Sequence, residues 1–324
     1  MNKSQRPWNT LLVVIADPFA KQQPALRKAI ELALRSGARL VLFNSFMVPQ
    51  PVNDVAMDAR AQIIAAAIRQ RRERMQELLA KSGVSGAKCI VKWDYPAHEA
   101  IVRQVLETRP DLVITSSHRH GRLARLLLAN TDWELIRVCP SPVWFVRSPT
   151  IPQQPRIIVA VDPFHAHDKP ARLDDRLLET ASIIARQFGG RISLVHAGDV
   201  PRDALQMRSL ILAKAEQAVR DLAARHDLER EFCDVRAGRP EDVIAMVEQN
   251  ESADLLVMGA VSRSIQGRPV IGNTAERVID QVDCDVLVVK PARFKAPALA
   301  SIERRRASSR HGIRAKRSSV HYSS

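Results

Sequence analysis

The stretch that decides the fold covers residues 254–291 and reads DLLVMGAVSRSIQGRPVIGNTAERVIDQVDCDVLVVKP. It opens with a short apolar run that ends at Met258 and Gly259, a pattern typical of a strand buried on both faces. Gly272, Asn273 and Thr274 then begin a helical pattern. The stretch therefore predicts a strand, a loop and a helix start. The unpaired N–H groups at such a start can receive a phosphate, although Asn and Thr also cap ordinary helices that bind no ligand.

The same pattern occurs earlier in the chain without gaps, at residues 111–147. Asp254 corresponds to Asp111, and Asn273-Thr274 corresponds to Asn130-Thr131. A repeat of this period is as long as a whole domain, so it indicates a duplicated fold and not a solenoid.

Both halves alternate short apolar runs with longer amphipathic segments. In the first half we predict strands at residues 11–16, 39–46, 88–93, 111–116 and 143–146, and helices at 22–36, 56–82, 97–107 and 132–138. The second half repeats this order, with strands at 157–161, 191–196, 231–236 and 255–258 and helices at 172–188, 203–225 and 241–248. Its fifth strand contains Val286, which corresponds to Val143 of the strand at 143–146. The fold class is therefore α/β, with two tandem doubly wound domains of five parallel strands each.

The predicted boundaries follow from composition. Domain 1 covers residues 1–147, a proline-rich linker covers 148–155, domain 2 covers 156–291, and a basic tail covers 292–324. The tail has nine Lys and Arg residues against one acid, so it supplies +8 of the net charge of +14. Its Ser- and Arg-rich composition predicts disorder, and it could contact nucleic acid or an anionic membrane surface, or simply increase solubility.

Several function classes find no support in the sequence. No segment has the apolar length of a membrane span, and the first apolar run is too short for a signal peptide. The four cysteines, which form no CxxC pair, are expected to be small apolar residues in a reducing cytoplasm. No catalytic motif is present, so we expect no enzyme activity beyond slow, incidental ATP hydrolysis. The pairs His118/His120 and His165/His167 lack a third ligand, so we predict no metal site.

An aspartate, Asp162, follows the first strand of the second half, and the run from Gly259 through Ser262 and Arg263 leads to Gly272. With these features and the tandem duplication, the chain resembles the universal stress protein family. The resemblance covers about residues 8–291 and implies an adenine nucleotide alpha hydrolase-like fold, a cytoplasmic role in the stress response, and domains that pair internally or dimerise. It also implies an ATP site in domain 2 formed by Asp162, Met258, Gly259, Ser262, Arg263, Gly272, Asn273 and Thr274.

Two residues depart from the family pattern. Ser262 replaces a glycine, and its Cβ restricts close approach of the backbone to a ligand. Asn273 replaces a serine or threonine but can still donate a hydrogen bond. In domain 1 the corresponding glycines are replaced by Ser116, Arg119 and Ala129, which predicts a degenerate site. Two hypotheses stay open: a sensor that binds ATP in domain 2, or a nucleotide-free interaction protein that acts through its domain interface or its tail.

Overall fold

The computed structural model describes residues 8–47, 57–117, 130–164, 172–198, 207–228, 232–260, 262–265, 268–271, 273–292 and 294. The strands and helices of domain 1 are β1 (Thr10–Val14), α1 (Pro24–Ser36), β2 (Arg39–Phe46), α2 (Met57–Ala80), β3 (Lys88–Trp93), α3 (Ala97–Thr108), β4 (Leu112–Ser116), α4 (Asn130–Val138) and β5 (Val143–Val146). Every strand predicted for this half is present, with ends that shift by at most two residues.

Domain 2 repeats the order. Its elements are β6 (Arg156–Ala160), α5 (Leu173–Phe188), β7 (Arg191–Gly198), α6 (Arg208–Arg225), β8 (Cys233–Ala237), α7 (Pro240–Glu251), β9 (Leu255–Gly259), β10 (Ser262–Ile265), β11 (Arg268–Ile271), α8 (Asn273–Gln281) and β12 (Asp285–Val289). The hairpin of β10 and β11 was not predicted, because we expected a loop there. The predicted helix at 203–225 begins later, at Arg208, and residues 203–206 lie outside the described residues.

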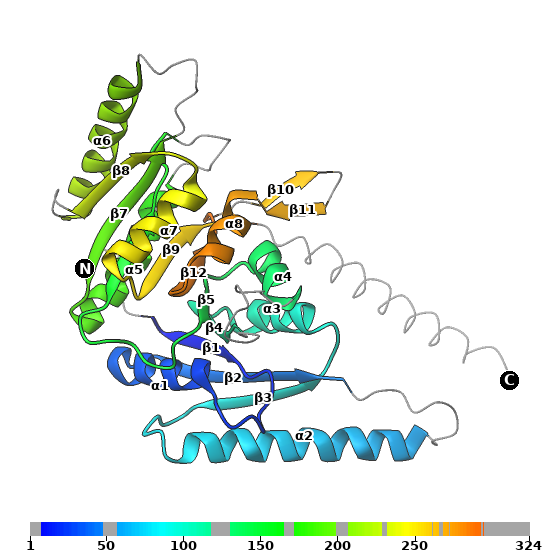
Figure 1. The fold of residues 1–324 in the computed structure, drawn as a ribbon. Helices are drawn as coiled ribbons and strands as arrows, with labels where there is room; N and C mark the ends of the chain where they lie inside the picture. Colours follow the sequence, from blue (N-terminus) through cyan, green and yellow to red (C-terminus); the bar gives the residue numbers. More distant parts are fainter. Residues whose placement is uncertain are drawn as a thin grey trace, which may run out of the picture.

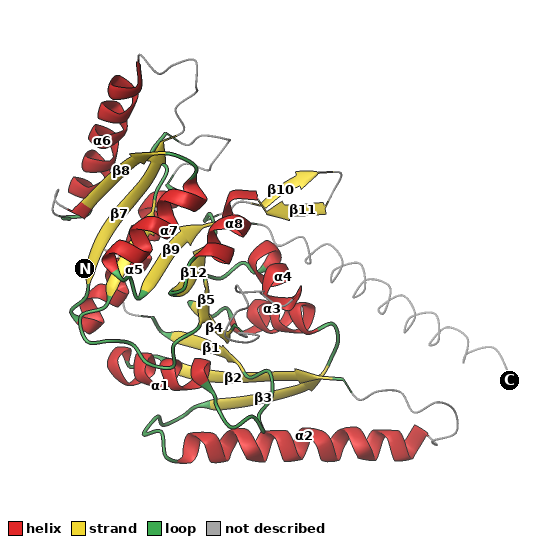
Figure 2. Ribbon diagram, viewed as in Figure 1, coloured by secondary structure: helices red, strands yellow, loops and turns green. Residues whose placement is uncertain are grey.

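The two domains share one sheet, which Figures 1 and 2 show running through the molecule. It has ten strands in the order β3-β2-β1-β4-β5-β12-β9-β6-β7-β8. The strands of this sheet are parallel within each domain, and among the described residues its only antiparallel ladder joins β5 to β12, with Trp144 opposite Leu287. The tandem domains therefore pair with each other edge to edge, one of the two arrangements that the sequence left open.

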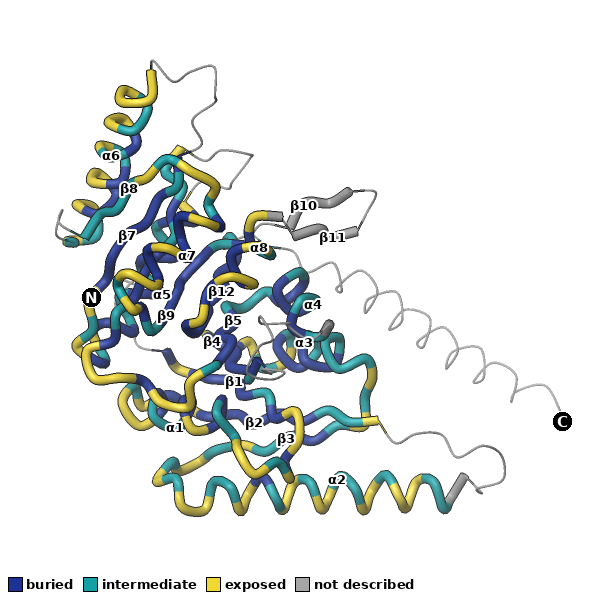
Figure 3. The backbone as a smooth tube through the Cα atoms, in the orientation of Figure 1, coloured by how far each residue is buried: buried dark blue, intermediate teal, exposed yellow. Residues whose placement is uncertain are grey.

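Helices cover both faces of the sheet. Apolar residues of α1, α2, α5 and α6 belong to one core cluster, and those of α3, α4, α7 and α8 belong to the other. Figure 3 shows the strands as the buried layer between them, whereas α2 is exposed along most of its length. This arrangement follows from right-handed crossovers on a sheet whose strand order reverses next to β1 and β6.

A buried polar cluster joins the domains at β12. The carboxylate of Asp285, which is 1% exposed, forms an ion pair with Lys28 of α1. It also accepts hydrogen bonds from the indole Nε1 of Trp144 (2.7 Å) and the backbone N–H groups of Arg147 (2.8 Å) and Ser148 (3.0 Å). The donors come from domain 1 and the start of the linker, so Asp285 ties the two domains together.

Positive side chains lie beside the ends of two strands at this junction. The guanidinium of Arg147 donates to the carbonyls of Val282 and, at 3.1 Å, Ile279 at the end of α8, where a cation complements the helix dipole. Lys290 follows β12 and is 2% exposed. Burial lowers the pKa of Lys290 to about 7, although its interaction with Cys139 opposes this shift.

The titration of Lys290 predicts how stability changes with pH. Since its folded pKa lies below its unfolded value, only the unfolded chain binds this proton between about pH 7 and 10. The free energy of unfolding should therefore rise with pH from 7 to 8.5, by at most about 1.4 kcal/mol per pH unit from this group. In urea denaturation, the Lys290→Met variant should not show this rise in the free energy of unfolding. The Lys81→Met variant, changed at an exposed position, should still show it. An equal rise in all three proteins would contradict the assignment.

All four cysteines are free thiols whose pKa is raised by burial. The pKa of Cys139 reaches about 12. A raised pKa keeps a thiol protonated and unreactive, which agrees with the interpretation of these residues as small apolar side chains. No helix among the described residues is long and apolar enough to cross a membrane.

Candidate functional site

The carboxyl ends of β6 and β9 lie side by side in domain 2. The two strands are neighbours in the sheet, with Ala160 opposite Met258. The helices that follow them, α5 and α8, pack on opposite faces. Adjacent connections that leave a parallel sheet on opposite faces create a crevice at the strand ends, and this is where ligands bind in such folds. Asp162 and Gly259 thus lie at two neighbouring strand ends, where such folds have their ligand crevice.

Asp162 has a backbone fixed by a second aspartate. It lies two residues past β6 and is half-buried, and its N–H donates to the carboxylate of Asp174, at 3.3 Å to Oδ1 and 3.2 Å to Oδ2. Asp174 is 3% exposed in the first turn of α5. An acid at this position also complements the helix dipole. Asp174 therefore couples the start of α5 to the end of β6, a role that the sequence analysis missed.

Gly259 borders a space that another residue already fills. A Cβ at Gly259 would lie 2.8 Å from Cδ2 of Leu173, which is 1% exposed at the start of α5. Only glycine allows this close packing without a shift of Leu173. On the α5 side of β9, the space beside Gly259 is therefore occupied by the side chain of Leu173.

Ser262 and Arg263 lie in β10, which pairs with β11 as an antiparallel hairpin. Ser262 is opposite Ile271, so the hairpin brings its two ends together. As a result, the chain forms a hairpin after β9, and the end of this hairpin, where α8 begins, lies next to its start. β11 also lies against α4 of domain 1, and Figure 1 shows the hairpin projecting from the end of the sheet.

The other predicted ligand residues lie around the start of α8. Asn273 is the first residue of this helix, and Thr274 is exposed in its first turn. Gly272 lies outside the described residues. Met258 is 4% exposed, and its side chain belongs to the core on the α7 and α8 face. Any contact of Met258 with a ligand therefore falls to its backbone, a limit that the sequence pattern did not reveal.

A buried histidine lies next to the crevice. Nδ1 of His196, on β7, is 3.0 Å from the carbonyl oxygen of Val161, so Nδ1 carries the proton in this contact. The ring of Phe164 meets the imidazole edge to face, with ring centroids 6.0 Å apart. No sequence motif marks this pair, because its members are far apart in the chain.

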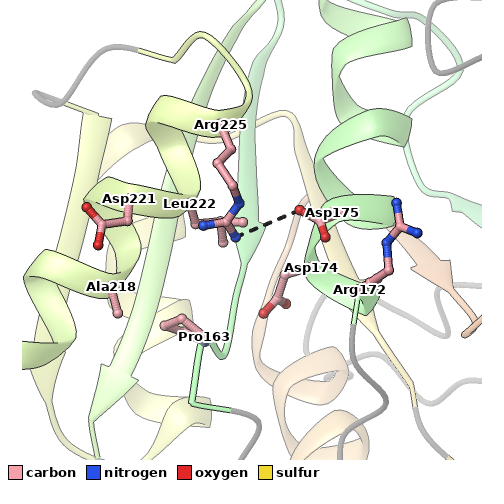
Figure 4. Close-up of a pocket in the computed structure, with 8 residues that line it drawn as sticks. All are labelled: Pro163, Arg172, Asp174, Asp175, Ala218, Asp221, Leu222 and Arg225. Atoms are coloured by element: carbon pink, nitrogen blue, oxygen red, sulfur yellow. Dashed lines mark ion pairs between the residues drawn. The ribbon is translucent and has the colours of Figure 1, made fainter. Parts of the chain in front are cut away.

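A pocket of about 210 Å³ adjoins the crevice between α5 and α6. Figure 4 shows its charged lining, in which Arg225 of α6 reaches toward Asp175 of α5. Nε2 of His226 lies 3.0 Å from the same carboxylate. The other lining residues are Pro163, Arg172, Asp174, Ala218, Asp221 and Leu222. Walls that carry both signs of charge suit a small polar ligand with hydroxyl or charged groups.

The corresponding strand end of domain 1 makes a different contact. Ser116, the residue at the position of Gly259, accepts a hydrogen bond through Oγ from the backbone N–H of Ala25 at the start of α1 (3.2 Å). Asn44 donates to the carbonyl of Ile15 at 2.6 Å and is fully buried. Arg119 and Ala129 lie outside the described residues. Ser116 thus acts as a helix cap in domain 1.

No cluster of three or more potential metal ligands occurs within the part of the chain that the structure describes. His118, His120, His165 and His167 lie in segments outside it. The charged tail is likewise outside the described residues from residue 295 onward.

Comparisons with known proteins agree with the duplicated fold. The sequence profile of the universal stress protein family matches residues 8–147 and 155–290. The chain is 29% identical over 313 residues to universal stress protein E of Escherichia coli K12, covering 88% of this chain and 95% of that protein. It is 25% identical to the universal stress protein E homolog of Haemophilus influenzae, covering 87% and 97% of the two chains.

Solved structures share the fold over nearly the whole length. A functionally unknown protein from Pseudomonas aeruginosa PAO1 superposes with a TM-score of 0.72 at 23% identity, covering 95% of this chain and all of that one. A universal stress protein from Archaeoglobus fulgidus superposes with a TM-score of 0.60 at 17% identity, covering 86% and 98% of the two chains. At these identities the likeness concerns the fold alone.

Proposed function

Because the chain belongs to the universal stress protein family across both of its domains, we propose that it is a regulatory sensor of cellular stress whose domain 2 binds an adenine nucleotide such as ATP. The observation that carries this proposal is the pairing of Ser262 with Ile271. Because Ser262 and Ile271 are the two ends of the hairpin, their pairing brings the end of β9 close to the start of α8, on the side of the sheet where Asp162 lies. The end of β9, the β10–β11 hairpin and the N-terminus of α8 together suit a ligand with a sugar and phosphates.

The proposed roles follow from position. Asp162 forms a hydrogen bond with the ribose or the base. The phosphate path is lined by the backbone of Met258 and Gly259 and by Ser262 and Arg263 of β10. At the start of α8, hydrogen bonds to a phosphate come from Gly272, Asn273 and Thr274. Binding shifts how the protein associates with partners in the cytoplasm. We propose no catalysis beyond slow, incidental ATP hydrolysis, because the sequence contains no motif that supplies a catalytic base or nucleophile.

The alternative proposal is a nucleotide-free interaction protein. It draws support from Leu173, which fills the space above Gly259, and from Ser116, which caps a helix in domain 1. In that case the fold acts through surfaces other than the crevice.

The tandem repeat supplies matched controls for the test. Freshly purified protein is denatured and searched for released nucleotide by mass spectrometry, and ATP is titrated into the stripped protein by calorimetry. We expect Asp162→Ala and Thr274→Ala each to weaken binding at least about tenfold, which corresponds to about 1.4 kcal/mol. Asp17→Ala and Thr131→Ala, at the corresponding positions of domain 1, should leave binding unchanged.

The absence of bound nucleotide together with no heat at millimolar ATP would favour the alternative. Equal loss of binding in the domain 1 and domain 2 variants would mean that the nucleotide does not bind at the proposed site of domain 2.

A further inference from the structure

Domain 1 carries aromatic side chains along the carboxyl edge of its sheet. Phe46 and Trp93 face each other as the last pair of the β2–β3 ladder. Trp93 is 42% exposed, Tyr95 just after it is 65% exposed, and Phe19 in the connection after β1 is 45% exposed. Aromatic residues make up only 4% of this chain, so their gathering at one edge is unusual for its composition.

Arginines of α2 stack on these rings. The guanidinium carbon of Arg60 lies 5.3 Å from the centroid of Trp93. That of Arg71 lies 4.6 Å from the centroid of Phe46 and 5.7 Å from that of Phe19. Arg60 and Arg71 are three helical turns apart, so they project from the same side of α2. We refer to the whole group as the arginine–aromatic edge, which comprises Phe19, Phe46, Arg60, Arg71, Trp93 and Tyr95.

Domain 2 shows that the fold does not require this edge. The last pair of the corresponding β7–β8 ladder is Gly198 and Ala237. Glu216, which lies as many residues before β8 as Arg71 lies before β3, replaces the arginine. At its carboxyl edge domain 2 keeps an exposed phenylalanine, Phe164, at the position of Phe19, but it has no aromatic pair that corresponds to Phe46 and Trp93. The fold therefore does not require that pair, and its presence in domain 1 needs another explanation.

The charge around the edge favours an anionic partner. The helix α2 has five arginines against three acids. Arg103 pairs with Asp94, next to Trp93, at 2.6 and 3.0 Å and also with Glu99 at 2.9 Å, so the excess of positive charge comes from α2. Arg69 and Arg72 on α2 are exposed. The surface thus combines flat aromatic faces with an excess of positive charge.

We propose that the arginine–aromatic edge binds single-stranded nucleic acid. Exposed bases stack on the aromatic rings and on guanidinium planes, while the arginines of α2 contact phosphates. A duplex hides the faces of its bases, so it could use only the phosphate contacts. This inference goes beyond the nucleotide site of domain 2, and it also differs from a purely electrostatic contact through the basic tail.

The test uses the full chain and fluorescein-labelled oligo(U) and oligo(dT) of about 15 nucleotides in anisotropy titrations. Because bases stack on exposed aromatic rings, Trp93→Ala should weaken binding by about tenfold. Arg71→Ala should have a similar effect, and Trp93→Phe should retain most of the affinity. Arg220→Ala, at an exposed position of α6 in domain 2, is the matched control and should bind like the parent. Thermal melts check that each variant folds.

Duplex DNA of the same length separates this proposal from binding through charge alone. If the duplex binds as tightly as the single strand and Trp93→Ala has no effect, the edge is not the binding surface and the proposal fails. It also fails if a polyglutamate peptide of similar length binds more tightly than the oligonucleotides and depends on the same residues, because the partner would then be an acidic protein segment.

Discussion

Replacing Asp285 with alanine is expected to lower the free energy of unfolding by about 3–5 kcal/mol, because it leaves the buried Lys28 without its counter-ion. The variant also removes the acceptor of the Trp144 indole N–H and of two backbone N–H groups at the start of the linker. A buried donor without a partner keeps its full desolvation cost. Chemical denaturation followed by far-UV circular dichroism measures the loss, and the domains should separate at lower denaturant than in the parent.

Two comparison variants make this result specific. Asp234→Ala removes a half-exposed aspartate of β8 whose partner is Arg236, so it should cost less than about 1 kcal/mol. The double variant Lys28→Met with Asp285→Leu should recover much of the loss, because apolar replacements remove both buried charges together. A loss below about 1 kcal/mol in Asp285→Ala would mean that the cluster does not hold the domains together.

The position of Asp285 explains why the sequence predicts the fold better than the junction. The hydrophobic periodicity of a strand or helix depends on residues that are neighbours in the sequence, and the duplication shows each pattern in two copies. The ten strands of the sheet could therefore be predicted from local pattern. Lys28, by contrast, lies in an amphipathic helix where a lysine normally faces solvent. Only the antiparallel pairing of β5 with β12 brings Lys28, Trp144 and Asp285 together, and no local pattern encodes that pairing.

The candidate site shows the same division. The spacing from Gly259 to Thr274 placed the strand end and the helix start correctly, since both depend on local signals. The hairpin between them escaped prediction because β10 and β11 have four residues each, too short for a periodic pattern, and β11 contains Pro269. Leu173 and Asp174 lie within the predicted helix at 172–188, where no local pattern marks them. Their contacts with Gly259 and Asp162 arise only when α5 packs against the strand ends.

Replacing Leu173 with alanine is expected to increase the affinity for ATP about tenfold, a gain of about 1.4 kcal/mol, because it empties the space beside the Gly259 backbone. It should also lower the free energy of unfolding by about 2–4 kcal/mol, as for other buried leucines. Leu177→Ala is the matched control, since Leu177 is equally buried one turn further along α5. It should be similarly destabilising without raising the affinity. Equal affinities in both variants, measured by calorimetry, would show that Leu173 does not limit access.

A double-mutant cycle then tests whether Leu173 is the reason that position 259 is a glycine. Gly259→Ala alone places a Cβ 2.8 Å from Cδ2 of Leu173 and should cost about 1–3 kcal/mol through overpacking. In the Leu173→Ala background the same change meets no such contact, so its cost should fall by at least about 0.5 kcal/mol. Additive costs would instead mean that Gly259 is required by its backbone alone. A coupled result, together with the gain in ATP affinity, would make Leu173 an internal competitor for the space beside the family glycine.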